Sequence, residues 1–344
     1  MTHFDDLRAN LREKPRRFCV TGVAGFIGSH ILEELLRLGQ EVIGVDNFAT
    51  GKRENLEDVR KIVGEKAFSK FTLAEGDICS PGFVASALKG ADVVIHQAAL
   101  GSVTRSIDNP LETNRVNVEG ALRVFEAAKT AGIKRVVYAS SSSVYGDLVM
   151  SPKREDVVGE PLSPYAASKK FNEIYAKLFG DLYGLEMVGL RYFNVFGPRQ
   201  DPNGDYAAVI PRWAAERLSG AESTIFGDGL TSRDFCFVSN VVQANLLAAF
   251  APCECAVGAY NVALGDETSL TELYHLIDGH ASTNPRAPRY AEFRPGDVRN
   301  SRADISKAIE NLGFAPSMPV KEGLKLTVEW YAQALRKGKS GAHS

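Results

Sequence analysis

The sequence predicts an α/β fold, a doubly wound parallel sheet followed by a smaller α/β domain in the C-terminal half. Three observations carry this prediction. Short, nearly continuous apolar runs alternate with helical patterns through the first half of the chain, as in a parallel sheet covered on both faces. The first apolar run ends in a glycine-rich turn that leads into a helix. After residue 194 the pattern changes to short segments separated by loops that contain glycine and proline.

Six strands and two long helices are predicted from these patterns. The strands are expected at Phe18–Thr21, Glu41–Asp46, Phe71–Glu75, Asp92–His96, Arg135–Ser140 and Met187–Arg191. The helices are expected at Thr113–Ala131 and Pro164–Leu182, the first from its apolar stripe. We expect residues 1–193 to form the sheet-centred domain and residues 194–344 to form mainly the second domain, with the chain crossing back near residues 231–265.

Composition limits the classes of function. The 344 residues carry a formal net charge of −2, which argues against nucleic-acid binding because no basic stripe is visible. Five cysteines without a CxxC pair indicate a reducing compartment, and no apolar run is long enough to span a membrane. We therefore expect a cytoplasmic protein that binds neither nucleic acid nor a membrane and holds no metal.

The glycine-rich turn after the first strand fits a dinucleotide. Gly22 would allow the tight turn, Gly25 would let the backbone approach a pyrophosphate, and Gly28 would let the helix pack closely on the sheet. The phosphates would lie on the free N–H groups of the helix N-terminus, beside Phe26 and Ile27. The alternative is an ordinary strand-to-helix turn with spare glycines.

Residues that follow the predicted strands are candidate cofactor contacts, because ligands of such sheets bind at the carboxyl ends of the strands. Asp46 closes the second strand, where a carboxylate would bind the adenosine ribose and repel a 2′-phosphate, so NAD is favoured over NADP. The alternative is an aspartate that caps a turn before Asn47 and Phe48. The candidates at the strand ends, Asn47 included, are Asp46, Asn47, Asp77, Ile78, Gln97, Ala98 and Ala99.

Two segments carry candidate chemistry. The fifth strand runs into serines at positions 140–143, and a later helix opens with Tyr165 and Lys169 on one helix face. A phenol is a poor base at neutral pH because its pKa is about 10, but the ammonium and a positively charged nicotinamide would lower that pKa. A serine hydroxyl beside the phenol would share its proton. Singly, a serine run is usually a polar loop and a Tyr–Lys pair a solvated helix face; together they suit oxidation of a secondary alcohol.

These segments resemble the extended short-chain dehydrogenase/reductase family, whose fold is of the Rossmann type. The matching motifs are TGVAGFIG (Thr21–Gly28), GDI, HQAAL (His96–Leu100), SSSSVYG, YAASK (Tyr165–Lys169) and VNVEG. The resemblance implies that Tyr165 is the base and that Lys169 binds the nicotinamide ribose. The assisting hydroxyl falls on Ser141, with Ser142 as the second choice. Two further cofactor-site residues implied in this way are Asn117 and Tyr192.

The second half of the chain resembles nucleotide-sugar epimerases, most closely the bacterial UDP-N-acetylglucosamine 4-epimerases of surface polysaccharide biosynthesis. The motifs are RYFNVFGPRQDPNG (Arg191–Gly204), AAVIPRW (Ala207–Trp213), FGDG, TSRDFCFV (Thr231–Val238) and FRPGDVRNSRADISKA (Phe293–Ala308). The resemblance implies that Asn194 contacts the UDP-sugar and that Arg233 and Arg294 hold its diphosphate. An ion pair with Asp234 is the alternative role of Arg233. Further implied substrate contacts are Ser102, Val103 and Val209.

Ser301 is the most informative departure within this family. Epimerases restricted to UDP-glucose and UDP-galactose have a bulky tyrosine at this place, whereas serine leaves room for a 2-acetamido group. The alternative is a loop serine of no consequence. The resemblance thus implies NAD-dependent 4-epimerisation of UDP-N-acetylglucosamine and UDP-N-acetylgalactosamine, with UDP-glucose and UDP-galactose as further candidates. It also implies a homodimer, formed through the helices at Thr113–Ala131 and Pro164–Leu182.

Three rival functions remain open from the sequence. A nucleotide-sugar 4,6-dehydratase or a UDP-glucuronate decarboxylase would need a carboxylate beside the strand-five hydroxyl, where Ser142 and Ser143 stand. An epimerase that acts at another carbon, such as C5, would share the cofactor residues. A non-catalytic NAD-sensing protein is disfavoured because Ser141, Tyr165 and Lys169 are all present.

Overall fold

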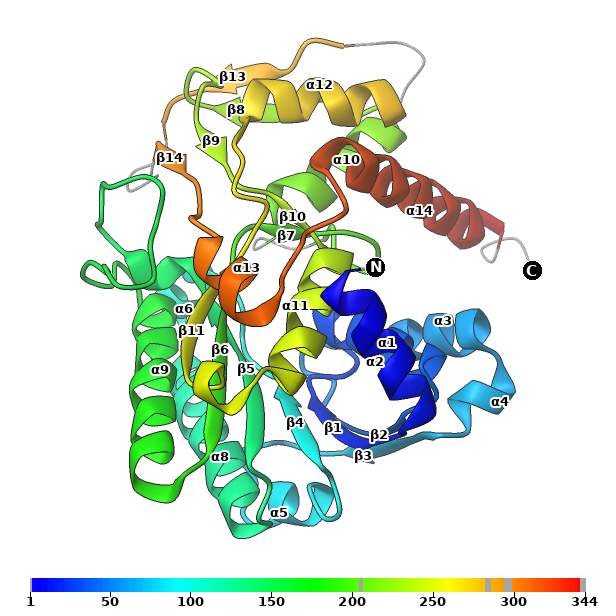
Figure 1. Ribbon diagram of the computed structural model, residues 1–344. Helices are drawn as coiled ribbons and strands as arrows, with labels where there is room; N and C mark the ends of the chain where they lie inside the picture. Colours follow the sequence, from blue (N-terminus) through cyan, green and yellow to red (C-terminus); the bar gives the residue numbers. More distant parts are fainter. Residues whose placement is uncertain (1, 204–206, 282–285, 294–298, 341–344) are drawn as a thin grey trace.

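The central sheet of the protein has seven parallel strands in the order β3–β2–β1–β4–β5–β6–β11 (Figure 1). The structure is a computed structural model that describes residues 2–203, 207–281, 286–293 and 299–340. The strands of the sheet are β1 (Arg17–Thr21), β2 (Glu41–Asp46), β3 (Phe71–Glu75), β4 (Val93–His96), β5 (Arg135–Ser141), β6 (Glu186–Tyr192) and β11 (Gly258–Val262). The predicted fold class is confirmed, and the six predicted strands agree with β1 to β6 to within one residue at each end.

The seventh strand comes from the second half of the chain. β11 pairs in parallel with β6, and Tyr260 lies opposite Leu190. The helix before it, α11 (Val238–Phe250), packs against α2 (Phe26–Arg37) and is buried over nearly its whole surface. The sequence predicts a crossing of the chain in this region but no strand.

Both faces of the sheet are covered by helices, so successive residues of a strand enter different cores. Phe18 and Val20 of β1 pack with the helices α2 and α11. Cys19 packs on the other face, in a cluster that includes residues of α8 (Ala121–Thr130) and α9 (Pro164–Tyr183). This alternation explains why the strands read as continuous apolar runs.

The helix predicted at Thr113–Ala131 differs from the prediction. It begins earlier, as α7 (Pro110–Asn114), continues as a π-helical turn at Arg115–Gly120, and only then becomes α8. The predicted helical segment is confirmed, but it begins three residues earlier, at Pro110, which suits a first helical turn, and it includes a π-helical turn. The second predicted helix forms as α9, which begins at Pro164 after the cap Ser163, whose Oγ accepts the Ala166 N–H at 3.1 Å.

The second part of the molecule lies at one end of the sheet, and its helices α10, α12 and α14 are at the top of Figure 1. These three helices pack around a cluster that includes Trp213, Tyr274 and Leu324. Their bounds are α10 (Val209–Ser219), α12 (Leu270–Ala281) and α14 (Val320–Ser340). Small sheets pair β7 (Val195–Phe196) with β10 (Cys236–Phe237), β8 (Thr224–Phe226) with β13 (Arg289–Ala291), and β9 (Ser232–Arg233) with both β12 (Thr268–Ser269) and β14 (Asn300–Ser301).

The remaining elements are short helices and connections around the sheet. They are α1 (His3–Glu13), α3 (Arg53–Val63), α4 (Glu65–Phe68), α5 (Phe83–Ala87), α6 (Val103–Asp108), α13 (Ser306–Leu312) and 3₁₀ turns at Ser142–Tyr145 and Cys253–Cys255. Within the described ranges, no helix combines the length and the apolar character needed to cross a membrane. The five cysteines form no disulfide, and a cytoplasmic location stays a prediction.

Candidate active site

The turn after β1 contains three glycines, so no side chain of these residues covers its backbone. Gly22 has φ +69°, and a Cβ there would lie 2.7 Å from the backbone nitrogen of Ala98. A Cβ on Gly28 would lie 2.1 Å from the Gly22 carbonyl oxygen, so the helix can approach the turn only through a glycine. Gly25 is the N-cap of α2 and offers no side chain to the first N–H groups of that helix. These N–H groups are therefore available to an anionic group such as a pyrophosphate.

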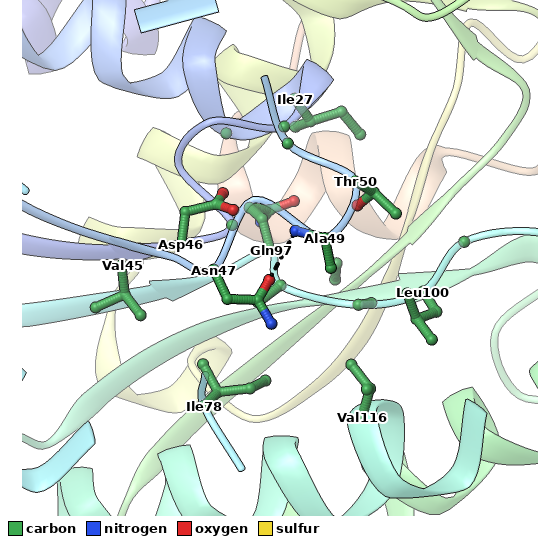
Figure 2. Close-up of a pocket in the computed structure, with 18 of the residues that line it drawn as sticks. Ile27, Val45, Asp46, Asn47, Ala49, Thr50, Ile78, Gln97, Leu100 and Val116 are labelled. Carbon is green, nitrogen blue, oxygen red and sulfur yellow. Dashed lines mark hydrogen bonds between the residues drawn. The ribbon is translucent and has the colours of Figure 1, made fainter. Parts of the chain in front are cut away.

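A cavity of about 310 Å³ lies next to this turn, and part of its lining is drawn in Figure 2. The predicted cofactor contacts that line it are Gly22, Gly25, Phe26, Ile27, Gly28, Asp46, Asn47, Asp77, Ile78, Gln97, Ala98, Ala99, Tyr165, Lys169 and Tyr192. Asn117 is buried and is not part of the lining. The sequence analysis missed other lining residues, among them Ala49 and Thr50 in the loop after β2 and Leu100 after β4.

Asp46 caps the turn after β2 and also lines the cavity, and its contact with the ribose stays a prediction. Its Oδ2 accepts the Ala24 N–H and its Oδ1 accepts the Phe48 N–H, each at 2.8 Å, as a turn-capping aspartate does. The same side chain lines the cavity, and burial raises its pKa against the effect of these N–H groups. Gly51 is needed beside it, because a Cβ there would lie 2.8 Å from Oδ1.

Asp77 is held by residues that the sequence analysis did not single out. Its Oδ1 accepts the Cys79 N–H at 2.8 Å, and its Oδ2 lies 3.3 Å from the Arg115 guanidinium. Burial works to raise the pKa of Asp77, but these two partners outweigh it and the pKa is lowered. Arg115 and Val116 also line the cavity, with Val116 on the same side as Ile78 in Figure 2. Both come from the π-helical turn, which no sequence pattern indicated.

Two predicted cofactor-site residues, Asn117 and Tyr192, make hydrogen bonds that involve side-chain amides. The Asn117 Oδ1 accepts the Leu100 N–H at 2.7 Å and its Nδ2 donates to the Leu100 carbonyl at 3.1 Å, so Asn117 holds a lining residue in place. The Tyr192 Oη donates to the Gln97 Oε1 at 3.1 Å and accepts from the Asn245 Nδ2 at 2.9 Å. Asn117 and Tyr192 therefore each hold a residue that lines the cavity, Leu100 and Gln97 respectively.

α9 brings Tyr165 and Lys169 to the cavity together. The Lys169 Nζ donates to the Ala139 carbonyl at 2.9 Å and lies 5.8 Å from the centre of the Tyr165 ring. Burial lowers the pKa of Lys169 to about 8 and raises the pKa of Tyr165, and a side-chain hydrogen bond with Ser141 opposes that rise. In the protein without cofactor, desolvation of the phenolate therefore dominates the pKa of Tyr165. The predicted lowering includes the effect of the nicotinamide charge, which acts only when the cofactor is bound, so it stays a prediction.

The serines at the end of β5 have different partners. Ser140 donates to Glu173 Oε1 at 2.6 Å, away from the phenol. The Ser143 N–H donates to the Ser141 Oγ at 3.1 Å. Since Ser141 already accepts this bond, its hydroxyl proton is free to be donated to the Tyr165 oxygen. Ser142 begins the 3₁₀ turn, and neither Ser141 nor Ser142 lines the cavity itself.

An ion pair between the buried Arg191 and the partly buried Glu173 connects this end of β5 to α9 and β6. Glu173 receives two bonds from Arg191, Nε to Oε1 at 2.9 Å and Nη2 to Oε2 at 2.8 Å. Arg191 Nη1 also donates to the Tyr145 hydroxyl at 3.0 Å, and that hydroxyl donates to Asn261 Oδ1 of β11 at 2.7 Å. The sequence analysis missed this network. Its signal was the spacing of Tyr165, Lys169 and Glu173, which puts all three on one face of α9.

Three of the predicted substrate residues lie close together, and the others lie elsewhere or outside the described residues. Arg233 and Ser301 are register partners in the parallel pair β9 and β14, and the Asn194 Nδ2 donates to the carbonyl of the next residue, Asp234, at 3.2 Å. Ser102 caps α6 and lines a second cavity of about 710 Å³, which shares Gly25, Phe26 and Gly101 with the first cavity. The remaining three are Val103, the exposed first residue of α6, Val209, the first residue of α10, and Arg294, which lies outside the described residues.

Known proteins resemble this chain over most of its length. The family model for the "NAD dependent epimerase/dehydratase family" matches residues 18–263. The UDP-glucose 4-epimerase of Mycolicibacterium smegmatis is 39% identical over 319 residues, which cover 92% of this chain and 98% of the relative. A solved UDP-N-acetylglucosamine 4-epimerase from Methanobrevibacter ruminantium M1, in complex with UDP-N-acetylmuramic acid, is 39% identical with a TM-score of 0.87 and covers 93% of this chain and 99% of its own.

The cavity fits NAD, and a second solved structure agrees with this. The Thermus thermophilus UDP-glucose 4-epimerase in complex with NAD is 37% identical with a TM-score of 0.80, and the match covers 92% of this chain and 99% of that chain. In this protein, the bare glycine turn suits the pyrophosphate and Asp46 at the end of β2 suits an unphosphorylated ribose. The chain belongs to the NAD dependent epimerase/dehydratase family, within the extended short-chain dehydrogenase/reductases, and its cofactor is NAD.

Proposed function

We propose that the protein is a UDP-N-acetylglucosamine 4-epimerase, which interconverts UDP-N-acetylglucosamine and UDP-N-acetylgalactosamine and accepts UDP-glucose and UDP-galactose as further substrates. Its relatives include 4-epimerases of UDP-sugars, which supports this reaction and this class of substrate. The observation that carries the finer proposal is the pairing of Arg233 with Ser301. A cation suited to a diphosphate and a small side chain suited to an acetamido group are neighbours on adjacent strands.

The proton chemistry centres on Tyr165. Its phenolate takes the proton of the sugar C4 hydroxyl, and the Ser141 hydroxyl donates a hydrogen bond to the phenolate oxygen, which stabilises the charged form. Lys169, with a pKa of about 8, stays largely protonated at pH 7 and adds a positive charge on the same helix face. NAD, when bound, would supply the hydride acceptor for C4 and the hydride donor for the return step. Tyr165 then returns the proton to the C4 oxygen, which completes the alcohol of inverted configuration.

The sugar must turn within the site between these two steps. We assign the diphosphate to Arg233, Arg294 and Asn194, so that the ring can rotate about a linkage that stays bound. Arg233 donates to the carbonyls of Ser232 and Arg299, which orients its guanidinium on β9. A planar guanidinium suits two phosphate oxygens at once.

The competing elimination and decarboxylation reactions lack an acid–base group beside Ser141. Ser142 and Ser143 follow it, and the carboxylate bonded to Ser140 belongs to Glu173. Glu173 is occupied by two bonds from Arg191 as well, so it is not free to exchange protons with a substrate. The residues around β5 therefore favour epimerisation over 4,6-dehydration.

The substitution Ser301→Tyr tests the acetamido preference. The purified protein is mixed with UDP-N-acetylglucosamine or UDP-glucose, and the anomeric proton of each product is followed by NMR. The bulky ring should reduce turnover of the acetylated substrate at least tenfold and leave that of UDP-glucose nearly unchanged. Asn300→Tyr is the matched control, because successive residues of a strand point to opposite faces. Equal effects on both substrates would contradict the specificity proposal, and absence of turnover with both in the unmodified protein would contradict the function.

We also propose that the protein is a homodimer through the helices α8 and α9. α9 exposes Phe171, Ile174, Leu178 and Leu182 at helical spacing, with 43% to 67% of each residue accessible. A continuous apolar stripe on an outer helix is typical of a covered face. Light scattering should give about twice the chain mass of 37.3 kDa, and Leu178→Glu should return the mass to that of one chain.

A further inference from the structure

Asp234 joins three segments of the second half of the chain through its carboxylate. The residue follows Arg233 at the end of β9 and is completely buried, with 0% of its surface exposed. Its Oδ1 accepts the Leu264 N–H at 2.9 Å, and its Oδ2 accepts the N–H groups of Gly265 at 3.0 Å and Ala303 at 3.2 Å. The first two donors lie in the loop after β11 and the third lies just after β14. One side chain thus connects β9 to two segments that are distant in sequence.

The backbone of Asp234 adds two further connections. Its N–H donates to the Ser301 carbonyl at 2.9 Å, and its carbonyl accepts the Asn194 Nδ2 at 3.2 Å. Asn194 has a positive φ of 28°, which a residue with a side chain adopts only when its surroundings hold it there. Arg233, Ser301 and Asn194 are therefore each adjacent to Asp234 in sequence or bonded to it.

We propose that Asp234 is the positioning residue of the sugar-nucleotide site, and that its carboxylate sets the places of Arg233, Ser301 and Asn194 relative to one another. This inference rests on the proposed function, in which these three residues hold the UDP-sugar. Asp234 acts through them and does not itself contact the substrate.

The hydrogen-bond requirement explains why a carboxylate stands here. Three N–H groups converge on two oxygens, and only a carboxylate offers acceptors on both atoms. Asparagine would turn an NH₂ group toward at least one of these donors and release its segment. The charge alone has the opposite effect, because a negative group beside Arg233 repels a diphosphate. Removal of the charge therefore strengthens binding if Asp234 acts through its field, and weakens binding if it acts by positioning.

Binding of UDP-glucose to the protein with its bound NAD decides between these effects. Calorimetry on Asp234→Asn should give a Kd about tenfold or more above that of the unmodified protein, which corresponds to loss of one buried hydrogen bond. Bound NAD, released by denaturation and quantified, should be unchanged. Unchanged or tighter binding in Asp234→Asn would overturn the inference alone. An unmodified protein that does not bind UDP-glucose would overturn the proposed function and this inference with it.

Asp278→Asn is the matched control. Asp278 is also a buried carboxylate of the second domain, and its partner is Arg217, with Nε 2.6 Å from Oδ1. Its substitution should lower the melting temperature of the protein but leave the affinity for UDP-glucose intact. If Asp278→Asn weakens UDP-glucose binding as much as Asp234→Asn does, general destabilisation explains both and the positioning role is wrong.

A second measurement needs no substitution at Asp234. Burial raises the pKa of Asp234 to about 7, Asp266 adds to the rise, and the three N–H groups oppose it. The other charged residues on the segments around it are Arg233, Arg302 and Asp304. The Kd for UDP-glucose should rise several-fold as the pH falls from 8 to 6, because the protonated carboxyl loses an acceptor. This dependence should become weaker in Arg233→Ala, in which Asp234 still positions Ser301 and Asn194, and a flat profile in the unmodified protein would overturn the inference.

Discussion

The two halves of the molecule each hold their working residues next to one carboxylate, partly buried Glu173 in the first and fully buried Asp234 in the second, and the two carboxylates have different partners. Glu173, below Tyr165 and Lys169 on α9, is neutralised by two bonds from the Arg191 guanidinium. Asp234, between Arg233 and the end of β14, receives its hydrogen bonds from backbone N–H groups. The first arrangement compensates a charge with a charge, and the second compensates it only with dipoles.

This difference has consequences for how each half responds to change. A carboxylate paired with a guanidinium is compensated by a full positive charge, so the catalytic end of the sheet is held by an ion pair. A carboxylate surrounded by N–H groups and cut off from water is costly to ionise, and the pKa of Asp234 rises to about 7. Glu173 is thus held by an ion pair, whereas the hydrogen bonds around Asp234 are expected to respond to protons near neutral pH.

The largest effect should come from Tyr165→Phe, which removes the chemistry and leaves both carboxylates in place. Turnover of UDP-glucose or UDP-N-acetylglucosamine should fall about 10²- to 10⁴-fold, the contribution of a positioned acid–base group. Bound NAD and the Kd for UDP-glucose should stay within a factor of about two, since the phenol oxygen holds neither the pyrophosphate nor the diphosphate. Tyr183→Phe, on the exposed C-terminal end of the same helix, is the control and should be fully active. Full activity of Tyr165→Phe would remove the catalytic assignment.

The next largest effect should come from Glu173→Gln, which converts the ion pair into an uncompensated buried cation. Loss of one partner of a buried pair costs about 3–5 kcal/mol, so the free energy of unfolding in urea should fall by that amount. Asp181→Asn, which breaks the exposed pair with Lys177 on the same helix, should change it by less than about 0.5 kcal/mol. A loss in Glu173→Gln as small as that of the control would show that Arg191 does not depend on Glu173, and the contrast between the two halves would fail.

The cofactor half could be predicted from sequence because its residues are carried by local patterns. Gly22 and Gly28 belong to one turn, Asp46 ends a strand, and Tyr165 and Lys169 share a helix face. Sequence patterns did not reveal Arg115, because it lies in a π-helical turn that departs from the 3.6-residue period. The role of Asp234 could not be predicted at all, because its donors are backbone N–H groups of distant segments and carry no side-chain signature.

The smallest of these effects is the pH dependence of stability, and it tests the contrast most directly. The folded protein holds the Asp234 proton up to a pH of about 7, whereas the unfolded chain releases it at the ordinary aspartate pKa of 3.8. The folded state therefore binds more protons in this interval, and the contribution of Asp234 to stability is present at low pH and lost as the pH rises through about 7. Between pH 5 and pH 8 this loss amounts to about 2–3 kcal/mol. Urea unfolding at the two pH values should show it in the unmodified protein.

The substitution Asp234→Asn should abolish this particular pH dependence, since the amide does not titrate, while Asp278→Asn should keep it. If Asp234→Asn and the unmodified protein lose the same free energy of unfolding between pH 5 and pH 8, Asp234 is ionised throughout and the two carboxylates behave alike. If the difference is found, the ionised form of Asp234 costs stability at the pH where the sugar-nucleotide residues are best ordered. Ionised Asp234 would then lower the free energy of unfolding while it orders the binding site, whereas Glu173 is stabilised by its pairing with Arg191.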